Sequence, residues 1–114
     1  GSNFNLLTGD DATTLAFMLY GGHGAISVTS NIAPKLCSSF MNNCMQNNYE
    51  EASRINDILM PLHSALFIES SPGPVKYAAS KLNLCEDEVR LPLINISEET
   101  KAIVDKALKH ASLL

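Results

Sequence analysis

The sequence has few basic residues and no long apolar run. Eight lysine and arginine residues stand against twelve acidic ones, which gives a formal net charge of -4 at pH 7. Proteins that bind phosphate backbones usually present a basic face, so this balance argues against nucleic acid as a partner. No apolar segment approaches the roughly 20 residues that cross a bilayer, and no basic-then-apolar leader opens the chain. We therefore expect a soluble, cytoplasmic protein with no membrane partner.

Cysteine and histidine are also scarce. Cys37, Cys44 and Cys85 are an odd number without close pairing, which argues against a disulfide scaffold and suits a reducing compartment. The first two fall about 10 Å apart along one expected helix, beyond disulfide reach, so we predict core thiols. The three histidines show no metal-ligand spacing, and we expect neither a metal nor a cofactor.

The length and composition suit one folded domain. The chain has 114 residues, of which 46% are hydrophobic, and this is too apolar for a disordered protein. Residues 1–2, Gly-Ser, look like the remnant of a cleaved expression tag and are left out of the fold prediction.

The first third of the chain predicts a strand, a helix and a second strand. Phe4 to Gly9 has the composition of a short buried strand, and Leu15, Met18 and Leu19 follow at helical spacing. Gly21 and Gly22 are typical of a helix end, and Ala25 to Ser30 predicts the second strand. Such units pair their strands in parallel, joined by a right-handed crossover.

The remainder predicts helices only. Helices are expected over 34–46, 49–67, 74–84 and 98–110, with Pro61 kinking the second and Ser97 capping the last. Apolar stripes predict which side chains face the core. These are Leu36, Cys37, Phe40, Met41, Cys44 and Met45, then Ile55, Ile58, Leu59, Leu62 and Leu66, then Ile103, Val104, Ala107, Leu108 and Ala111. Glu50 and Arg54 predict an outward ion pair, and 85–96 a packed loop.

Two short parallel strands do not make a complete sheet. Parallel strands need neighbours at both edges and layers on both faces, and the sequence offers no third convincing strand. Two explanations remain open: helices wrap the two strands in an unusual small fold, or the chain is a piece of a larger α/β protein. The tag-like start directly before a strand favours the second.

Candidate polar residues lie at the strand ends. The "GGHG" run (21–24) follows a helix and precedes a strand, which is the reverse of the dinucleotide-binding pattern, so His23 is expected to be a turn residue bonding locally. Asp10 and Asp11 follow the first strand, at the end where parallel α/β proteins place their sites. We expect one of them to cap the next helix and the other to be free to face a substrate.

Four segments together resemble one known family. They are "LLTGDDATTLAFMLYGGHGAISVTSNIAP", "INDILMPLHSALFIESSPGPVKYAASKLNL", "VRLPL" and "ALKHASLL". In order and spacing they are similar to the C-terminal part of the dihydrodipicolinate synthases (4-hydroxy-tetrahydrodipicolinate synthases). The resemblance implies an α/β fold, the C-terminal part of a (β/α)8 TIM barrel. Residues 3–46 would form the last two β/α units, and residues 47–114 a helical C-terminal extension.

The resemblance also implies a chemistry. The family condenses pyruvate with L-aspartate-4-semialdehyde in lysine and diaminopimelate biosynthesis, through a Schiff base on a lysine of an earlier barrel strand. That strand would precede Phe4, so the resemblance implies no catalytic residue and no activity in this chain alone. It implies a backbone carbonyl at Ile26 beside the pyruvate adduct, with Gly9 and Asp10 near the semialdehyde pocket. It further implies a homo-oligomer that requires no metal or cofactor.

Two alternatives are weighed against this interpretation. One is a fragment of a pyruvate-dependent sialic acid or keto-sugar-acid aldolase, although the "PLHSALF" and "PVK" stretches point away from it. The other is a stand-alone helical interaction module, which would be a monodisperse monomer that unfolds cooperatively.

Overall fold

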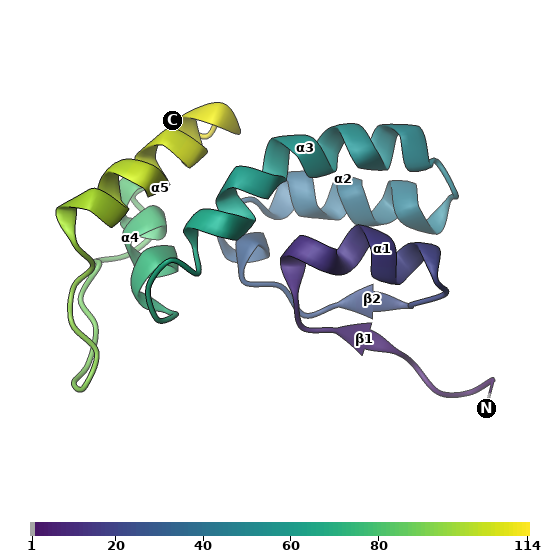
Figure 1. The fold of residues 1–114 in the computed structure, drawn as a ribbon, viewed down its shortest axis with the longest axis horizontal. Coiled ribbons are helices and arrows are strands. Elements are labelled where there is room, and N and C mark those ends of the chain that lie inside the picture. Colours follow the sequence, from purple (N-terminus) through teal and green to yellow (C-terminus); the bar gives the residue numbers. More distant parts are fainter. Residues whose placement is uncertain (1) are drawn as a thin grey trace.

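The computed structural model describes residues 2–114 as an elongated body measuring 44 × 29 × 21 Å. A small parallel sheet with α1, α2 and α3 lies at one end, and α4 and α5 lie at the other (Figure 1). The elements are β1 (Leu7–Thr8), η1 (Asp11–Thr13), α1 (Thr14–Leu19), β2 (Gly24–Ala25), η2 (Thr29–Asn31), α2 (Pro34–Met45), α3 (Tyr49–Ala65), α4 (Gly73–Lys81) and α5 (Glu98–His110).

The two strands pair in parallel, as the pattern predicted. Leu7 lies opposite Gly24 and Thr8 opposite Ala25, and Gly21, just beyond the end of the intervening helix, has a positive φ of 98°. Both strands are shorter than predicted, and the expectation of a buried first strand is wrong, since Leu7 is 53% exposed. The apolar side chains stay in solvent because no further strand or helix among residues 2–114 covers them.

Of the predicted strand over 25–30, only Ala25 lies in β2, and the chain turns shortly after it. Residues 29–31 form the 3-10 helix η2. The Asp11 carboxylate accepts hydrogen bonds from the backbone N–H groups of Val28 and Thr29, which a neighbouring strand would otherwise receive. A side-chain acceptor from another element thus ended the strand, and periodicity does not report such an acceptor.

Helix α2 begins at Pro34 as predicted and places Phe40 and Cys44 in the core. Its last apolar residue, Met45, was expected to face inward but is exposed, and it is also the last residue of the helix. Leu19, the last residue of α1, is exposed as well.

Helix α3 is the central packing element. Ile55, Leu59 and Leu62 are fully buried against α2, α5 and the turns after the strands, and the helix bends along its length around Pro61 (Figure 1). The predicted Glu50 ion pair is wrong. The Arg54 guanidinium instead donates to both Glu51 carboxylate oxygens, at 2.9 and 2.6 Å, one turn back on the same face.

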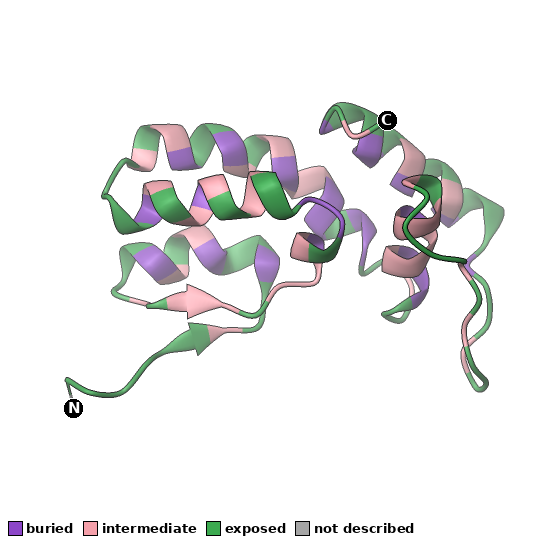
Figure 2. Ribbon diagram, turned by 180° about the vertical axis from the view of Figure 1, so that it is seen from behind, coloured by how far each residue is buried: buried purple, intermediate pink, exposed green. Residues whose placement is uncertain are grey.

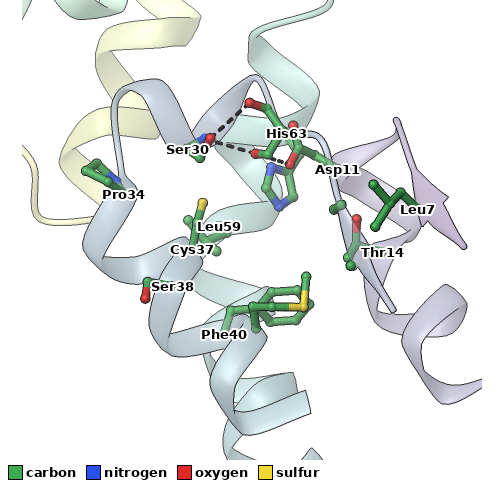
Figure 3. A pocket seen from close by; sticks show the side chains of 14 residues that line it. Leu7, Asp11, Thr14, Ser30, Pro34, Cys37, Ser38, Phe40, Leu59 and His63 are labelled. Carbon is green, nitrogen blue, oxygen red and sulfur yellow. Dashed lines mark hydrogen bonds between the residues drawn. The ribbon is translucent and has the colours of Figure 1, made fainter. Parts of the chain in front are cut away.

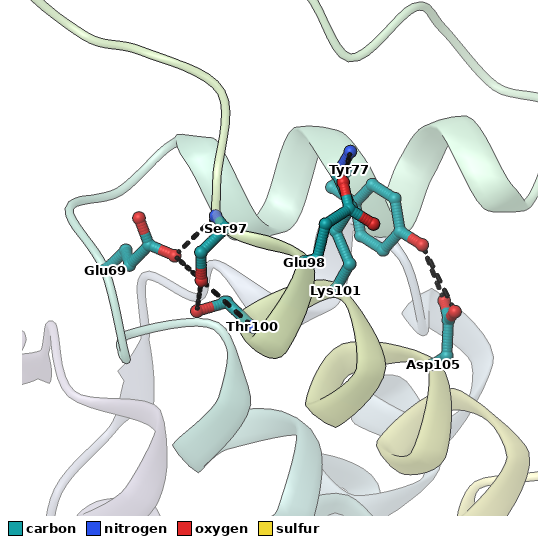
Figure 4. Close-up of polar contacts among 7 residues, drawn as sticks. All are labelled: Glu69, Tyr77, Ser97, Glu98, Thr100, Lys101 and Asp105. Atoms are coloured by element: carbon teal, nitrogen blue, oxygen red, sulfur yellow. Dashed lines mark hydrogen bonds and ion pairs between the residues drawn. The ribbon is translucent and has the colours of Figure 1, made fainter.

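Helices α4 and α5 are fastened by local polar contacts. The Ser97 hydroxyl oxygen accepts the Thr100 N–H at 3.2 Å, which confirms the predicted cap, and the Glu69 carboxylate accepts from the Ser97 N–H and hydroxyl (Figure 4). On the neighbouring turns the Tyr77 hydroxyl donates to Asp105, and the Lys101 ammonium lies over the Tyr77 ring. Val104, Ala107, Leu108 and Ala111 are buried as predicted, whereas Ile103, which was also expected to face inward, is 40% exposed.

The 85–96 loop is not packed, contrary to the prediction. It extends away from α4 and α5, and its residues are exposed or only partly buried until Ile96 (Figures 1 and 2). Leu91 is 87% exposed, so the apolar composition that suggested packing has no partner among residues 2–114. One bond joins the loop to the helices, from the Lys76 ammonium to the Glu88 carbonyl.

Candidate functional site

The three predicted site residues come together at one end of the sheet. Gly9 and Asp10 directly follow β1, and Ile26 directly follows β2. The parallel register makes them neighbours, because the Ile26 N–H donates to the Thr8 carbonyl at 2.8 Å. Carboxyl ends of parallel strands are where α/β proteins assemble their sites. The backbone therefore brings these three residues together, and all three are exposed.

Asp10 does not cap the following helix with its side chain. Its carboxylate accepts from the Thr13 hydroxyl at 2.6 Å, and its carbonyl accepts from the Thr14 hydroxyl at 2.8 Å. These bonds fix the turn after β1 and leave one edge of the exposed carboxylate open to solvent. One member of the acidic pair was predicted to cap the next helix, and the Asp10 side chain does not do so.

The burial of Asp11 and its bonding partners were not predicted from the sequence. It is 7% exposed, and its carboxylate accepts from the Ser27 hydroxyl at 2.5 Å and from the N–H groups of Val28 and Thr29 at 2.9 and 3.2 Å. It thus caps the start of η2, a turn 17 residues away, rather than η1, to which it belongs. An acidic residue after a strand is a weak signal for such a long-range bond.

His63 is a second buried polar residue at this end of the molecule. Its ring Nδ1 lies 2.7 Å from the Thr29 hydroxyl oxygen, where α3 passes below η2. Burial lowers the pKa of His63, and the negative charges of Asp11 and Asp10 oppose this shift. The imidazole is thereby kept neutral as a structural hydrogen-bonding group. The sequence alone did not indicate this contact.

A cavity of about 520 Å³ opens between the sheet, α2 and α3. Asp11, Ser30 and His63 lie together at one end of it, and Phe40 and Leu59 form its apolar floor (Figure 3). Cys37 points toward the polar end, and burial together with the Asp11 charge raises the pKa of its thiol to about 11. A protonated thiol is a poor nucleophile, so Cys37 is a packing residue here, in agreement with the prediction for this cysteine.

The remaining candidates have structural places. His23 lies in the turn before β2, but the expectation that it bonds locally is wrong: its ring Nδ1 accepts at 2.8 Å from the N–H of Leu6, 17 residues earlier, which the parallel pairing of the strands brings beside it. Within the described part of the chain, no group of three or more histidine, cysteine and acidic side chains is arranged to hold a metal ion. Among residues 2–114, no helix combines the length and apolar composition needed to cross a membrane.

Comparison with known sequences gives one consistent answer. Residues 1–111 match the sequence profile of the Dihydrodipicolinate synthetase family. The chain is 55% identical over 117 positions to the 4-hydroxy-tetrahydrodipicolinate synthase of Pelagibacter ubique and 50% identical over 114 positions to that of Afipia carboxidovorans. In each case all of this chain is covered, but only 40% and 38% of the relative.

The fold agrees with the sequence comparison. The dihydrodipicolinate synthase of Thermotoga maritima superposes with a TM-score of 0.96 at 38% identity, over 99% of this chain and 38% of that one. Its fold is of the TIM-barrel class, and the mixed helical chain with its small parallel sheet corresponds to part of it. The chain spans about two fifths of the length of the relatives it matches.

Proposed function

The chain belongs to the Dihydrodipicolinate synthetase family, and from this premise we propose that it is the C-terminal part of a Schiff-base lyase. The complete protein condenses pyruvate with L-aspartate-4-semialdehyde to 4-hydroxy-tetrahydrodipicolinate, in lysine and diaminopimelate biosynthesis. The observation that carries this proposal is the family match over residues 1–111, together with a sequence identity of 50% to a named synthase.

The proposed place of the chain is the end of the barrel. β1 and β2 are the last two barrel strands within residues 3–46, and residues 47–114 are the helical extension. The exposed apolar residues in and directly after the strands support this, since Leu7 and Ile26 are 53% and 72% exposed and parallel strands are normally covered. The free sheet edges are where the remaining strands would pair.

In this proposal the chain supplies one wall of the active site. A lysine from an earlier strand forms the iminium with pyruvate and releases water. Loss of a methyl proton then gives the enamine that attacks the aldehyde. The Ile26 carbonyl accepts a hydrogen bond beside the pyruvate adduct, and Gly9 and Asp10 border the semialdehyde. The chain contributes no catalytic side chain and is inactive alone.

The two alternatives receive less support. The matched relatives are named as synthases, which favours this reaction over a sialic acid or keto-sugar-acid aldolase. A stand-alone helical module fits poorly with the open sheet edge and the uncovered apolar strands. The complete protein is proposed to be a cytoplasmic homo-oligomer, and sedimentation velocity on the purified protein tests the oligomer.

A borohydride-trapping experiment tests the proposed function. The complete protein is incubated with pyruvate, reduced with borohydride and analysed by mass spectrometry. We expect one pyruvate-derived adduct on a lysine outside residues 2–114, and none on the isolated 114-residue chain. Labelling of any lysine within this chain, or no adduct on the complete protein, would contradict the proposal.

A further inference from the structure

The Asp11 carboxylate joins the turns that follow both strands. It leaves the β1 turn and accepts from the Ser27 hydroxyl, the Val28 N–H and the Thr29 N–H of the β2 turn, at 2.5, 2.9 and 3.2 Å. We call these three hydrogen bonds the Asp11 clamp. Two of the three donors are backbone groups, so the clamp fixes main-chain position and not only a side chain.

A second set of bonds supports the same turn. The Ser27 hydroxyl oxygen also accepts the Ser30 N–H at 3.0 Å, and the Ser30 hydroxyl donates to the Ser27 carbonyl at 2.9 Å. From the other side, His63 lies 2.7 Å from the Thr29 hydroxyl. The segment from 27 to 30 is thereby fixed by Asp11 on one side and by α3 on the other.

The peptide group directly before this segment contains the Ile26 carbonyl. On its N-terminal side, the Ile26 N–H donates to the Thr8 carbonyl at 2.8 Å, and on its C-terminal side Ser27 is fixed by Asp11. Peptide groups are planar, so anchors on both sides restrict the few dihedral angles that orient the carbonyl. The Ile26 side chain is 72% exposed and contributes little packing that could do this instead.

We propose that Asp11 is a positioning residue that orients the Ile26 carbonyl toward the substrate adduct. The proposal rests on the proposed function, which places pyruvate beside this carbonyl, and it adds a residue that touches no substrate. The two aspartates then have different roles: Asp10 is exposed at the strand end, where it borders the substrate, and Asp11 is buried and positions the backbone.

The chemistry of the clamp predicts a graded response to substitution. In an Asp11→Asn variant, the amide oxygen accepts both N–H groups while its NH₂ donates to the Ser27 hydroxyl oxygen. The geometry is therefore largely retained. In an Asp11→Ala variant all three donors lose their acceptor, and the turn after β2 is released.

The first experiment measures steady-state kinetics in the complete protein. Asp11→Ala is expected to lower kcat/KM for pyruvate by about 10- to 100-fold, because a displacement of about 1 Å at a reacting group costs up to that much. Asp11→Asn is expected to stay within about fivefold of the unsubstituted protein, since its amide keeps the hydrogen bonds. Tyr77→Phe, which removes the hydroxyl bonded to Asp105 in the helical extension, is the matched control and leaves kcat/KM unchanged.

The second experiment separates this proposal from the proposed function. The carbonyl carbon resonance of Ile26 is compared by NMR in the same variants. It is expected to shift in Asp11→Ala, to shift less in Asp11→Asn and to stay in place in Tyr77→Phe. If the unsubstituted protein forms no pyruvate adduct, the proposed function is wrong, while the Ile26 resonance still decides whether the clamp exists.

The outcomes that overturn the proposal are direct. An unchanged Ile26 resonance in Asp11→Ala excludes the positioning role, as does an equal loss of kcat/KM in the alanine and asparagine variants. If Asp11→Ala does not fold, Ser27→Ala replaces it, because this change removes one bond of the clamp and the acceptor of the Ser30 N–H but keeps the two backbone bonds to Asp11. It is expected to give a smaller loss in the same direction, and no loss would contradict the clamp.

Discussion

The two ends of the molecule differ in how far they bury leucine and isoleucine side chains. At the helical end, formed by α4, α5 and the last turns of α3, Leu62, Leu66 and Leu108 are completely buried. At the sheet end, formed by β1, β2 and the turns that follow them, Leu6, Leu7 and Ile26 are between 50% and 72% exposed. Figure 2 shows this contrast along the ribbon.

Helices and parallel strands need different numbers of packing partners. An amphipathic helix buries one stripe, and a second helix crossing it is enough to cover that stripe. A strand of a parallel sheet has two faces and two edges, and all four need partners. The leucines between α3 and α5 are therefore covered by residues of this chain, whereas the two strands lack such a cover and the turns after them are joined by the Asp11 clamp.

The largest predicted effect compares one leucine from each end. Leu62→Ala removes a fully buried side chain of α3 and is expected to destabilise the chain by about 2–5 kcal/mol. Leu7→Ala removes a half-exposed side chain of β1 and is expected to cost less than about 1 kcal/mol. The free energies of unfolding are measured by urea denaturation of the 114-residue chain at one protein concentration. Equal costs for the two variants would mean that the sheet end is covered in solution, for example by self-association.

The sequence predicted the helices better than the strands, and the reason is physical. Helix α5 shows its apolar stripe, its Ser97 cap and its terminal charges within 14 consecutive residues, all of them local. The strand over 25–30 could not be delimited in this way, because its end is set by Asp11 from another element. The 85–96 loop failed differently: its apolar residues were interpreted as packed, and the residues that would pack on them are not in residues 2–114.

The candidate site was likewise predictable only where its residues follow from local sequence. The pattern placed Gly9 and Asp10 at the end of the first strand, whereas it placed Ile26 inside the second, and only the family resemblance made Ile26 a site residue. The proximity of the three residues follows from the parallel register. The buried partners Asp11 and His63 could not be paired with Ser27 and Thr29, because these bonds span 16 and 34 residues and have no fixed spacing.

The Ser97 cap at the helical end contributes to stability without any contact to the sheet end. Ser97→Ala removes the acceptor for the Thr100 N–H and is expected to destabilise the chain by about 1 kcal/mol. Because the cap lies far from the sheet end, the Ile26 resonance should not move. Ser53→Ala, at an exposed position inside α3, is the control and should cost nothing. A cost for Ser97→Ala no larger than this control would contradict the capping role.

A smaller effect is expected from acid at the sheet end. Burial lowers the pKa of His63 below its ordinary value of 6.5, so the unfolded chain binds this proton more readily than the folded one. The stability from His63 is therefore present above pH 6.5 and is lost as the pH falls through the lowered pKa. We expect the slope of unfolding free energy against pH in this window to decrease in His63→Gln and to persist in His110→Gln, whose imidazole is exposed. Identical slopes in both variants would contradict a neutral, buried His63.

The smallest effect on stability is expected from substitution of the exposed cysteine. The labelling rate of each thiol also measures how accessible its region of the molecule is. Cys85 is exposed in the 85–96 loop, so Cys85→Ser should change the free energy of unfolding by less than about 0.5 kcal/mol. Burial raises the pKa of both Cys37 and Cys44, to about 11 for Cys37, so neither supplies much thiolate near neutral pH. A chromogenic disulfide reagent at pH 7.5 should therefore label Cys85 rapidly in the native chain and the other two only after denaturation. Cys37 lies in the cavity beneath the sheet. Rapid labelling of Cys37 would show that the sheet end opens while the helical end stays folded. Protection of Cys37 would show that the hydrogen-bonded turns keep the uncovered sheet closed against α2.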